Sequence, residues 1–126
     1  MMVTVSAILF AILTGIVMIF QGCLAAGLPW GEASMGGKFP GKYPPKMRVV
    51  AVINIFLLAF FALVVLIRAE LLLPQLFQFS RIAIWFIVVY SAIGTVLNTI
   101  TPSKIERIWA PVAGLQLITS ILIAIS

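Results

Sequence analysis

The chain has 126 residues, of which 63% are hydrophobic and 9% are charged, and its formal net charge is +5. Soluble domains carry charged residues at about a quarter of their positions, so this chain has too little polar material to cover an apolar interior with a water-facing shell. The composition therefore excludes a soluble globular domain and predicts one integral membrane domain.

Four apolar segments are each long enough to cross a bilayer, which takes about 20 helical residues. They predict an all-α, four-helix transmembrane bundle formed by the whole chain, with helices at about 3–28, 46–70, 81–100 and 103–126 and a structured loop at 29–45. The first segment lacks the Lys or Arg of a signal-peptide n-region and is longer than an h-region. We therefore expect it to be retained as a helix.

Capping signals refine the ends of the third and fourth helices. Ser80 is placed to cap the third helix. The spacing of Ser103 and Glu106 is that of a capping box, which predicts that the fourth helix begins near 103. Pro111 would then fall inside that helix, where its ring clashes with the carbonyl four residues earlier, so we expect a kink there.

The first helix carries small residues at helical spacing. Ala7, Ala11 and Gly15 recur every four residues, so they share one face. Small side chains let another helix backbone approach closely. This stripe is our candidate for a buried helix-packing seam.

Each predicted helix also contains one amide side chain within its apolar run. These four candidate interior residues are Gln21, Asn54, Asn98 and Gln116. An unpaired amide facing lipid is costly, which predicts that they point into the bundle and bond across helices. The alternative is that they line a polar path or ligand pocket.

The first connection is rich in Gly, Pro and Lys. Gly supplies positive φ and Pro fixes φ, so these residues predict several enforced turns rather than a loose linker. Its basic side chains and paired glycines could hold an anionic lipid headgroup or a partner, the glycines through exposed backbone donors. The candidate binding residues are Trp30, Gly31, Gly36, Gly37, Lys38, Lys42 and Arg48. The alternative is a plain connector whose lysines only set topology.

Orientation follows from the distribution of positive charge among the connections. Six basic residues lie in the first and third connections (Lys38, Lys42, Lys46, Arg48, Lys104 and Arg107), and two lie in the second (Arg68 and Arg81). Short loops rich in Lys and Arg stay in the cytoplasm. We expect a multi-pass plasma-membrane protein with residues 29–48 in the cytoplasm, both termini outside, and Trp30, Tyr43 and Trp109 in an inner aromatic belt.

The residue types that usually form catalytic, metal or proton-transfer sites are nearly absent. There is no His and only one Cys, and no ionisable residue lies well inside an apolar run. These absences argue against a bis-His haem, a catalytic triad, an intramolecular disulfide and a proton relay. Small multidrug exporters are also short four-helix proteins, but their coupling chemistry uses a Glu in the first helix. The first segment of this chain has no Glu, so the resemblance fails. We therefore expect no catalytic residue, no metal and no cofactor.

The loop pattern resembles that of a family of small, uncharacterised four-helix membrane proteins of bacteria. The matching residues are Pro29-Trp30-Gly31, Gly36-Gly37, Pro40-Gly41, Pro44 and Arg48. The resemblance implies a bacterial plasma membrane and a functional loop, but no activity.

Three functions remain open at this point. The favoured one is a non-catalytic membrane component that binds a lipid, a second copy or another membrane protein, and we expect no nucleic-acid partner. The second is a carrier or channel for a small neutral or anionic solute. A lipid-acting enzyme built around Glu32 is third, because one carboxylate without a partner acid or His is weak evidence for catalysis.

Overall fold

The computed structural model describes residues 2–126 and confirms a four-helix membrane bundle. The four main helices are α1 (Met2–Ala26), α2 (Pro45–Arg68), α3 (Phe77–Ile100) and α4 (Trp109–Ala124). Short 3₁₀ turns lie between them: η1 (Gly31–Ala33), η2 (Met35–Gly37), η3 (Pro74–Leu76) and η4 (Glu106–Ile108). The four spans, counting the 3₁₀ turns that precede α3 and α4, are long and apolar enough to cross a bilayer.

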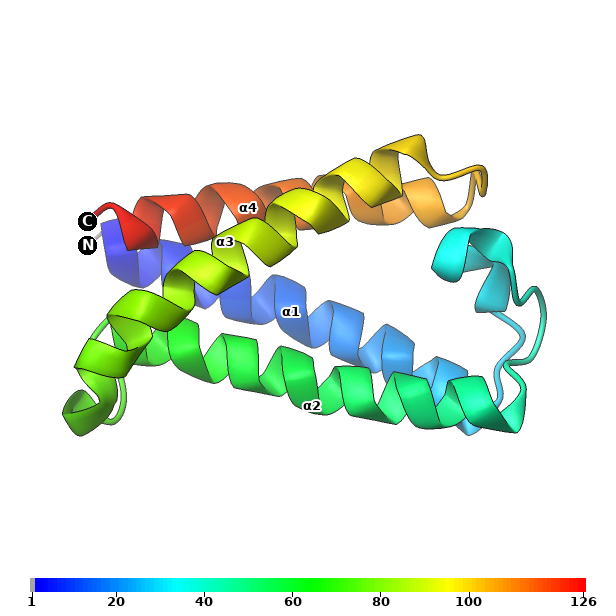
Figure 1. The fold of residues 1–126 in the computed structure, drawn as a ribbon, viewed down its shortest axis with the longest axis horizontal. Coiled ribbons are helices and arrows are strands. Elements are labelled where there is room, and N and C mark those ends of the chain that lie inside the picture. Colours follow the sequence, from blue (N-terminus) through cyan, green and yellow to red (C-terminus); the bar gives the residue numbers. More distant parts are fainter. Residues whose placement is uncertain (1) are drawn as a thin grey trace.

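The helices form two closely packed pairs, α1 with α2 and α3 with α4, and α1 also packs on α4. The contact between α2 and α3 is much smaller. The N-terminus of α1 and the C-terminus of α4 lie at the same end of the bundle, and η1 and η2 fold over the opposite end (Figure 1). This opposite end is called the loop end below.

The two ends of the bundle are packed differently. The larger core cluster draws on all four helices and lies near the termini of the chain; it includes Phe10, Val65, Ile84 and Ile123. Only a small cluster of Leu24, Tyr43 and Ala51 fills the loop end. Solid packing therefore joins the helices near the termini and leaves the loop end less filled.

The end of α1 is set by Gly27, which has a φ of +98°. The backbone N–H of Gly27 donates to the carbonyl of Leu24, and the N–H of Leu28 donates to the carbonyl of Cys23, both at 3.1 Å. This pair of bonds is a Schellman motif, which ends a helix at the residue before a left-handed glycine. Arg48 adds a bond from Nε to the Ala25 carbonyl at 2.9 Å. The helix therefore stops short of the expected residue 28.

Two expected helix starts were wrong. Ser80 does not cap α3, because the helix begins at Phe77 and the buried Ser80 hydroxyl donates within it to the Phe77 carbonyl at 2.6 Å. The fourth α-helix begins at Trp109 rather than near 103, since η4 precedes it. Pro111 consequently lies in the first turn of α4, where a missing N–H leaves no bond unmade, and the reason for a kink disappears.

The small-residue stripe on α1 is a seam over only part of its length. Ala7 is fully buried in the larger core cluster. A side chain built at Gly15 would meet nothing within 4 Å. The expected close helix contact at Gly15 was therefore wrong: α1 is still packed at this level, where Leu13 and Thr14 are buried, but no neighbouring helix lies against the Gly15 position.

Candidate functional site

A cavity of about 870 Å³ lies at the loop end between the two helix pairs. Its wall on one side comes from α1 and α2, including Phe20 and Leu58, and on the other from α3 and α4, including Ile93 and Trp109. Residues 33–43 of the first loop cover its end. Its volume falls within the range of about 300–1,000 Å³ that small-molecule pockets occupy.

All four predicted interior amides reach this cavity. Gln21, Asn54, Asn98 and Gln116 line it from four different helices. Gln116 donates from Nε2 to the Thr14 hydroxyl at 2.9 Å and so links α4 to α1. Asn98 donates from Nδ2 to the Gly94 carbonyl of its own helix at 2.7 Å. The expected bond across helices is present for Gln116, whereas Asn98 bonds within its own helix; all four amides line the cavity, as the pocket alternative allowed.

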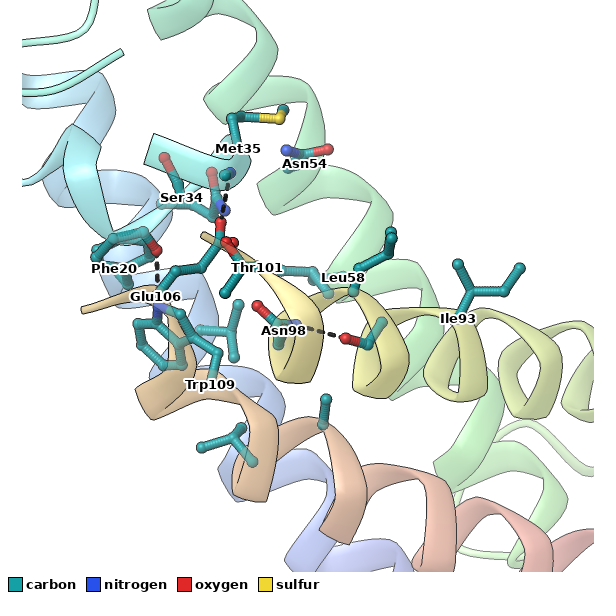
Figure 2. A pocket seen from close by; sticks show the side chains of 18 of the residues that line it. Phe20, Ser34, Met35, Asn54, Leu58, Ile93, Asn98, Thr101, Glu106 and Trp109 are labelled. Atoms are coloured by element: carbon teal, nitrogen blue, oxygen red, sulfur yellow. Dashed lines mark hydrogen bonds between the residues drawn. The ribbon is translucent and has the colours of Figure 1, made fainter. Parts of the chain in front are cut away.

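Glu106 is the residue that sequence reasoning missed. It is only 7% exposed and lines the cavity, and its Oε2 accepts a hydrogen bond from the backbone N–H of Gly36 at 3.0 Å (Figure 2). Glu106 was noticed in the sequence, but its spacing from Ser103 assigned this carboxylate to the capping box of a helix start. Half of that box exists, because the Glu106 N–H donates to the Ser103 hydroxyl at 3.3 Å.

The other half is replaced by contacts to the loop. In a capping box the Glu106 carboxylate would accept a hydrogen bond from the backbone N–H of Ser103. This N–H donates instead to Thr101 Oγ1 at 3.2 Å. The Glu106 side chain is thereby left for Gly36. Two further bonds join the same segments: Ser103 Oγ donates to the Glu32 carbonyl at 2.6 Å, and Trp109 Nε1 donates to the Ala33 carbonyl at 3.1 Å. Three hydrogen bonds therefore fix the loop over the cavity.

The glycines of the loop serve this fold directly. A side chain at Gly31 would overlap the Phe39 carbonyl, and its own N–H donates to the Gly41 carbonyl at 2.9 Å. Gly36 and Gly37 have φ values of +66° and +77°. The Gly36 donor is taken by Glu106 and the Gly37 donor by the Ser34 carbonyl at 2.8 Å. The expected exposed donors for a phosphate are therefore already used within the chain.

The basic candidates of the loop divide into two groups. Lys38 and Lys42 are exposed, and Lys38 also lines the cavity. Arg48 lies in the first turn of α2, bonds the Ala25 carbonyl and packs over Gly27, so it joins the start of α2 to the end of α1. Trp30 is exposed at the surface of the loop.

Tyr43 is buried rather than part of an exposed aromatic belt. It is 4% exposed, and its hydroxyl shares a hydrogen bond with Ser34. Burial raises the pKa of the Tyr43 hydroxyl above its ordinary value of 10.0; the Ser34 bond lowers this pKa and the charge of Glu106 raises it. Tyr43 therefore stays protonated and acts as a neutral hydrogen-bonding group beside the cavity.

The lining is apolar along the helices and polar under the loop. Ile93, Leu97 and Ile100 of α3 line the cavity and are each more than half exposed, so the cavity is open on the side where α2 and α3 separate. Ser34, Thr101 and Glu106 gather at the loop end (Figure 2). Within residues 2–126, no cluster of three or more His, Cys, Asp or Glu side chains could hold a metal.

Comparisons with protein-family models, with curated proteins and with solved structures gave no significant match. The assignment of a function therefore depends on the geometry of the cavity.

Proposed function

We propose that this protein is a non-catalytic membrane component that binds a lipid or a lipid-like amphiphile in the cavity between α2 and α3. The observation that carries the proposal is the position of the opening. The exposed lining residues Ile93, Leu97 and Ile100 lie on a membrane-spanning helix, so in a bilayer the opening would face acyl chains. A tail could enter between the helices while a polar group reaches Ser34, Thr101 and Glu106 under the loop.

The second candidate is a carrier for a small neutral or anionic solute. The four amides in the lining support it, because amides can bond a neutral solute inside a membrane. The larger core cluster near the termini would have to open for such a solute to cross.

Filling the cavity tests the proposal. A side chain at Gly94 would meet nothing within 4 Å, and Gly94 lines the cavity, so Gly94→Phe should occupy the space meant for the ligand. Gly15→Phe is the matched control, because Gly15 is equally free on its helix but lies outside the cavity lining. Native mass spectrometry of gently extracted protein should show a retained lipid in the wild type and in Gly15→Phe, and less in Gly94→Phe. A retained polar solute in place of lipid would favour the carrier, and equal lipid retention in both variants would contradict the proposed site.

We also propose that the loop end lies in the cytoplasm of a plasma membrane, as the charge bias indicates. The test uses a background in which Cys23 is replaced by Ala. Lys42→Cys is well placed because Lys42 is exposed, whereas Ser34 is buried. A membrane-impermeant thiol reagent should leave Lys42→Cys unlabelled in intact cells and label Ser126→Cys. The reverse pattern would invert the orientation.

A further inference from the structure

We propose that the cavity selects an amphiphile whose headgroup carries an ammonium group, and in particular a zwitterionic phospholipid with its ammonium at Glu106 and its phosphate toward Lys38. This inference rests on the proposed function and names its ligand class. It departs from the possibility raised by the basic loop, which was an anionic headgroup.

The first observation is a carboxylate in a mostly apolar cavity without a cationic partner. Glu106 is 7% exposed, and the partner of its side chain is the neutral N–H of Gly36. Among residues 2–126 no Lys or Arg donates a hydrogen bond to this carboxylate, and the nearby Arg107 donates to the Thr101 carbonyl instead. A buried carboxylate is costly unless it is paired, and its remaining lone pairs can accept the N–H groups of a ligand. An ammonium is the ligand group that supplies both the charge and the donors.

The second observation is the aromatic surface beside this carboxylate. Trp109, three residues after Glu106, and Phe20 both line the cavity, with ring centroids 4.7 Å apart. The buried Tyr43 lies in the lining as well. Aromatic faces attract cations, most strongly where water is excluded. The carboxylate and the rings therefore favour the same kind of ligand group.

Lys38 distinguishes a zwitterion from a simple cation. Its side chain is exposed at the loop and also lines the cavity, so it offers a positive charge at the rim while Glu106 offers a negative one deeper inside. A headgroup with a phosphate followed by an ammonium matches this order. The acyl chains would extend past Leu58 and Leu97 to the opening between α2 and α3.

Lipid competition on the full chain tests the inference. Delipidated protein is given an equimolar mixture of three lipids with identical acyl chains: a phosphatidylethanolamine, a phosphatidylglycerol and a diacylglycerol. Native mass spectrometry then reports which is retained. A charge-assisted hydrogen bond should favour the ethanolamine lipid over the glycerol lipid by about tenfold in the wild type.

Glu106→Gln should reduce this preference to near unity while the protein stays folded, because the Gln oxygen can still accept the bond from Gly36. Glu32→Gln is the matched control: it removes the same charge from an exposed loop position outside the cavity lining, and should leave the preference unchanged. Lys38→Gln leaves the loop contacts intact and should lower retention of both phospholipids relative to diacylglycerol.

The outcomes separate the inference from the proposed function. Wild-type protein that retains phosphatidylglycerol as well as or better than phosphatidylethanolamine would overturn the ammonium assignment while leaving lipid binding in place. An ethanolamine preference that survives Glu106→Gln would do the same. Retention of none of the three lipids, diacylglycerol included, would overturn the proposed function itself. The wild-type ratio decides the matter even if a variant fails to fold.

Discussion

Glu106 accepts a hydrogen bond of 3.0 Å from the backbone N–H of Gly36, which lies 70 positions earlier in the chain. The bond joins the first loop to the segment before α4, so two connections far apart in sequence close the same end of the bundle. It also places a carboxylate at the covered end of the cavity.

Removing this acceptor should loosen the loop. Glu106→Ala leaves the partly buried Gly36 N–H without its partner, and we expect a loss of about 1–3 kcal/mol in the free energy of unfolding, because hydrogen bonds to charged groups contribute more than neutral ones. Glu106→Gln keeps an acceptor at nearly the same place and should lose much less. Thermal unfolding in detergent measures both variants. Equal losses for Ala and Gln would show that the bond to Gly36 contributes little.

The small-residue stripe of α1 should respond unevenly to enlargement. Ala7 is 0% exposed within the larger core cluster, so Ala7→Leu should overfill it and cost about 1–3 kcal/mol. Gly15→Leu on the same face should leave the melting temperature unchanged or slightly higher, since nothing lies within 4 Å of the new side chain. Thermal melts of the two variants in one detergent provide the comparison. A large loss for Gly15→Leu would indicate a helix partner at this position, such as a second copy of the chain.

The hydrogen bond between Gln116 and Thr14 should couple α4 to α1. A double-mutant cycle with Thr14→Ala and Gln116→Ala should give a coupling energy of about 0.6 kcal/mol, the average for side-chain bonds between membrane helices. Asn98→Ala provides the control, because the Asn98 side chain bonds the Gly94 carbonyl of its own helix, so its loss should be additive with Thr14→Ala. Coupling to Asn98 as strong as coupling to Gln116 would contradict this geometry.

Stability should fall at high pH in part through Tyr43. Burial raises the pKa of this hydroxyl above 10.0 in the folded state, so the protonated form is favoured by folding. The contribution of the neutral Tyr43 hydroxyl to the free energy of unfolding is fully present below pH 10. This contribution is lost as the pH rises through the folded-state pKa. Tyr43→Phe removes the titrating group. Melting temperatures measured from pH 8 to 11 should therefore decline less steeply in Tyr43→Phe than in the wild type. Parallel declines would show that Tyr43 does not titrate within this range.

The helix spans could be predicted from local sequence because each depends on residues close together in the chain. The apolar run of residues 46–70 was long enough to cross a bilayer, and it forms α2 within two residues of the expected ends. Helix ends were less predictable, because several neighbouring residues can each supply the hydrogen bonds that start a helix. Ser80 was expected at a helix start, yet the helix already begins at Phe77. The Ser80 hydroxyl donates back to the Phe77 carbonyl.

The candidate site required the tertiary structure. The sequence placed one amide in each helix, because an apolar run makes a polar residue conspicuous, but it did not show that Asn54 and Asn98 face one cavity instead of each other. The place of Glu106 in the cavity could not be predicted for a different reason. The local capping-box pattern already gave this carboxylate a role at a helix start, so no distant partner was sought. Its true partner, Gly36, is brought near only when the helix pairs assemble and the loop folds across them. Local periodicity thus determines which segments enter the membrane, whereas the cavity arises because α2 and α3 pack together near the termini and separate towards the loop end.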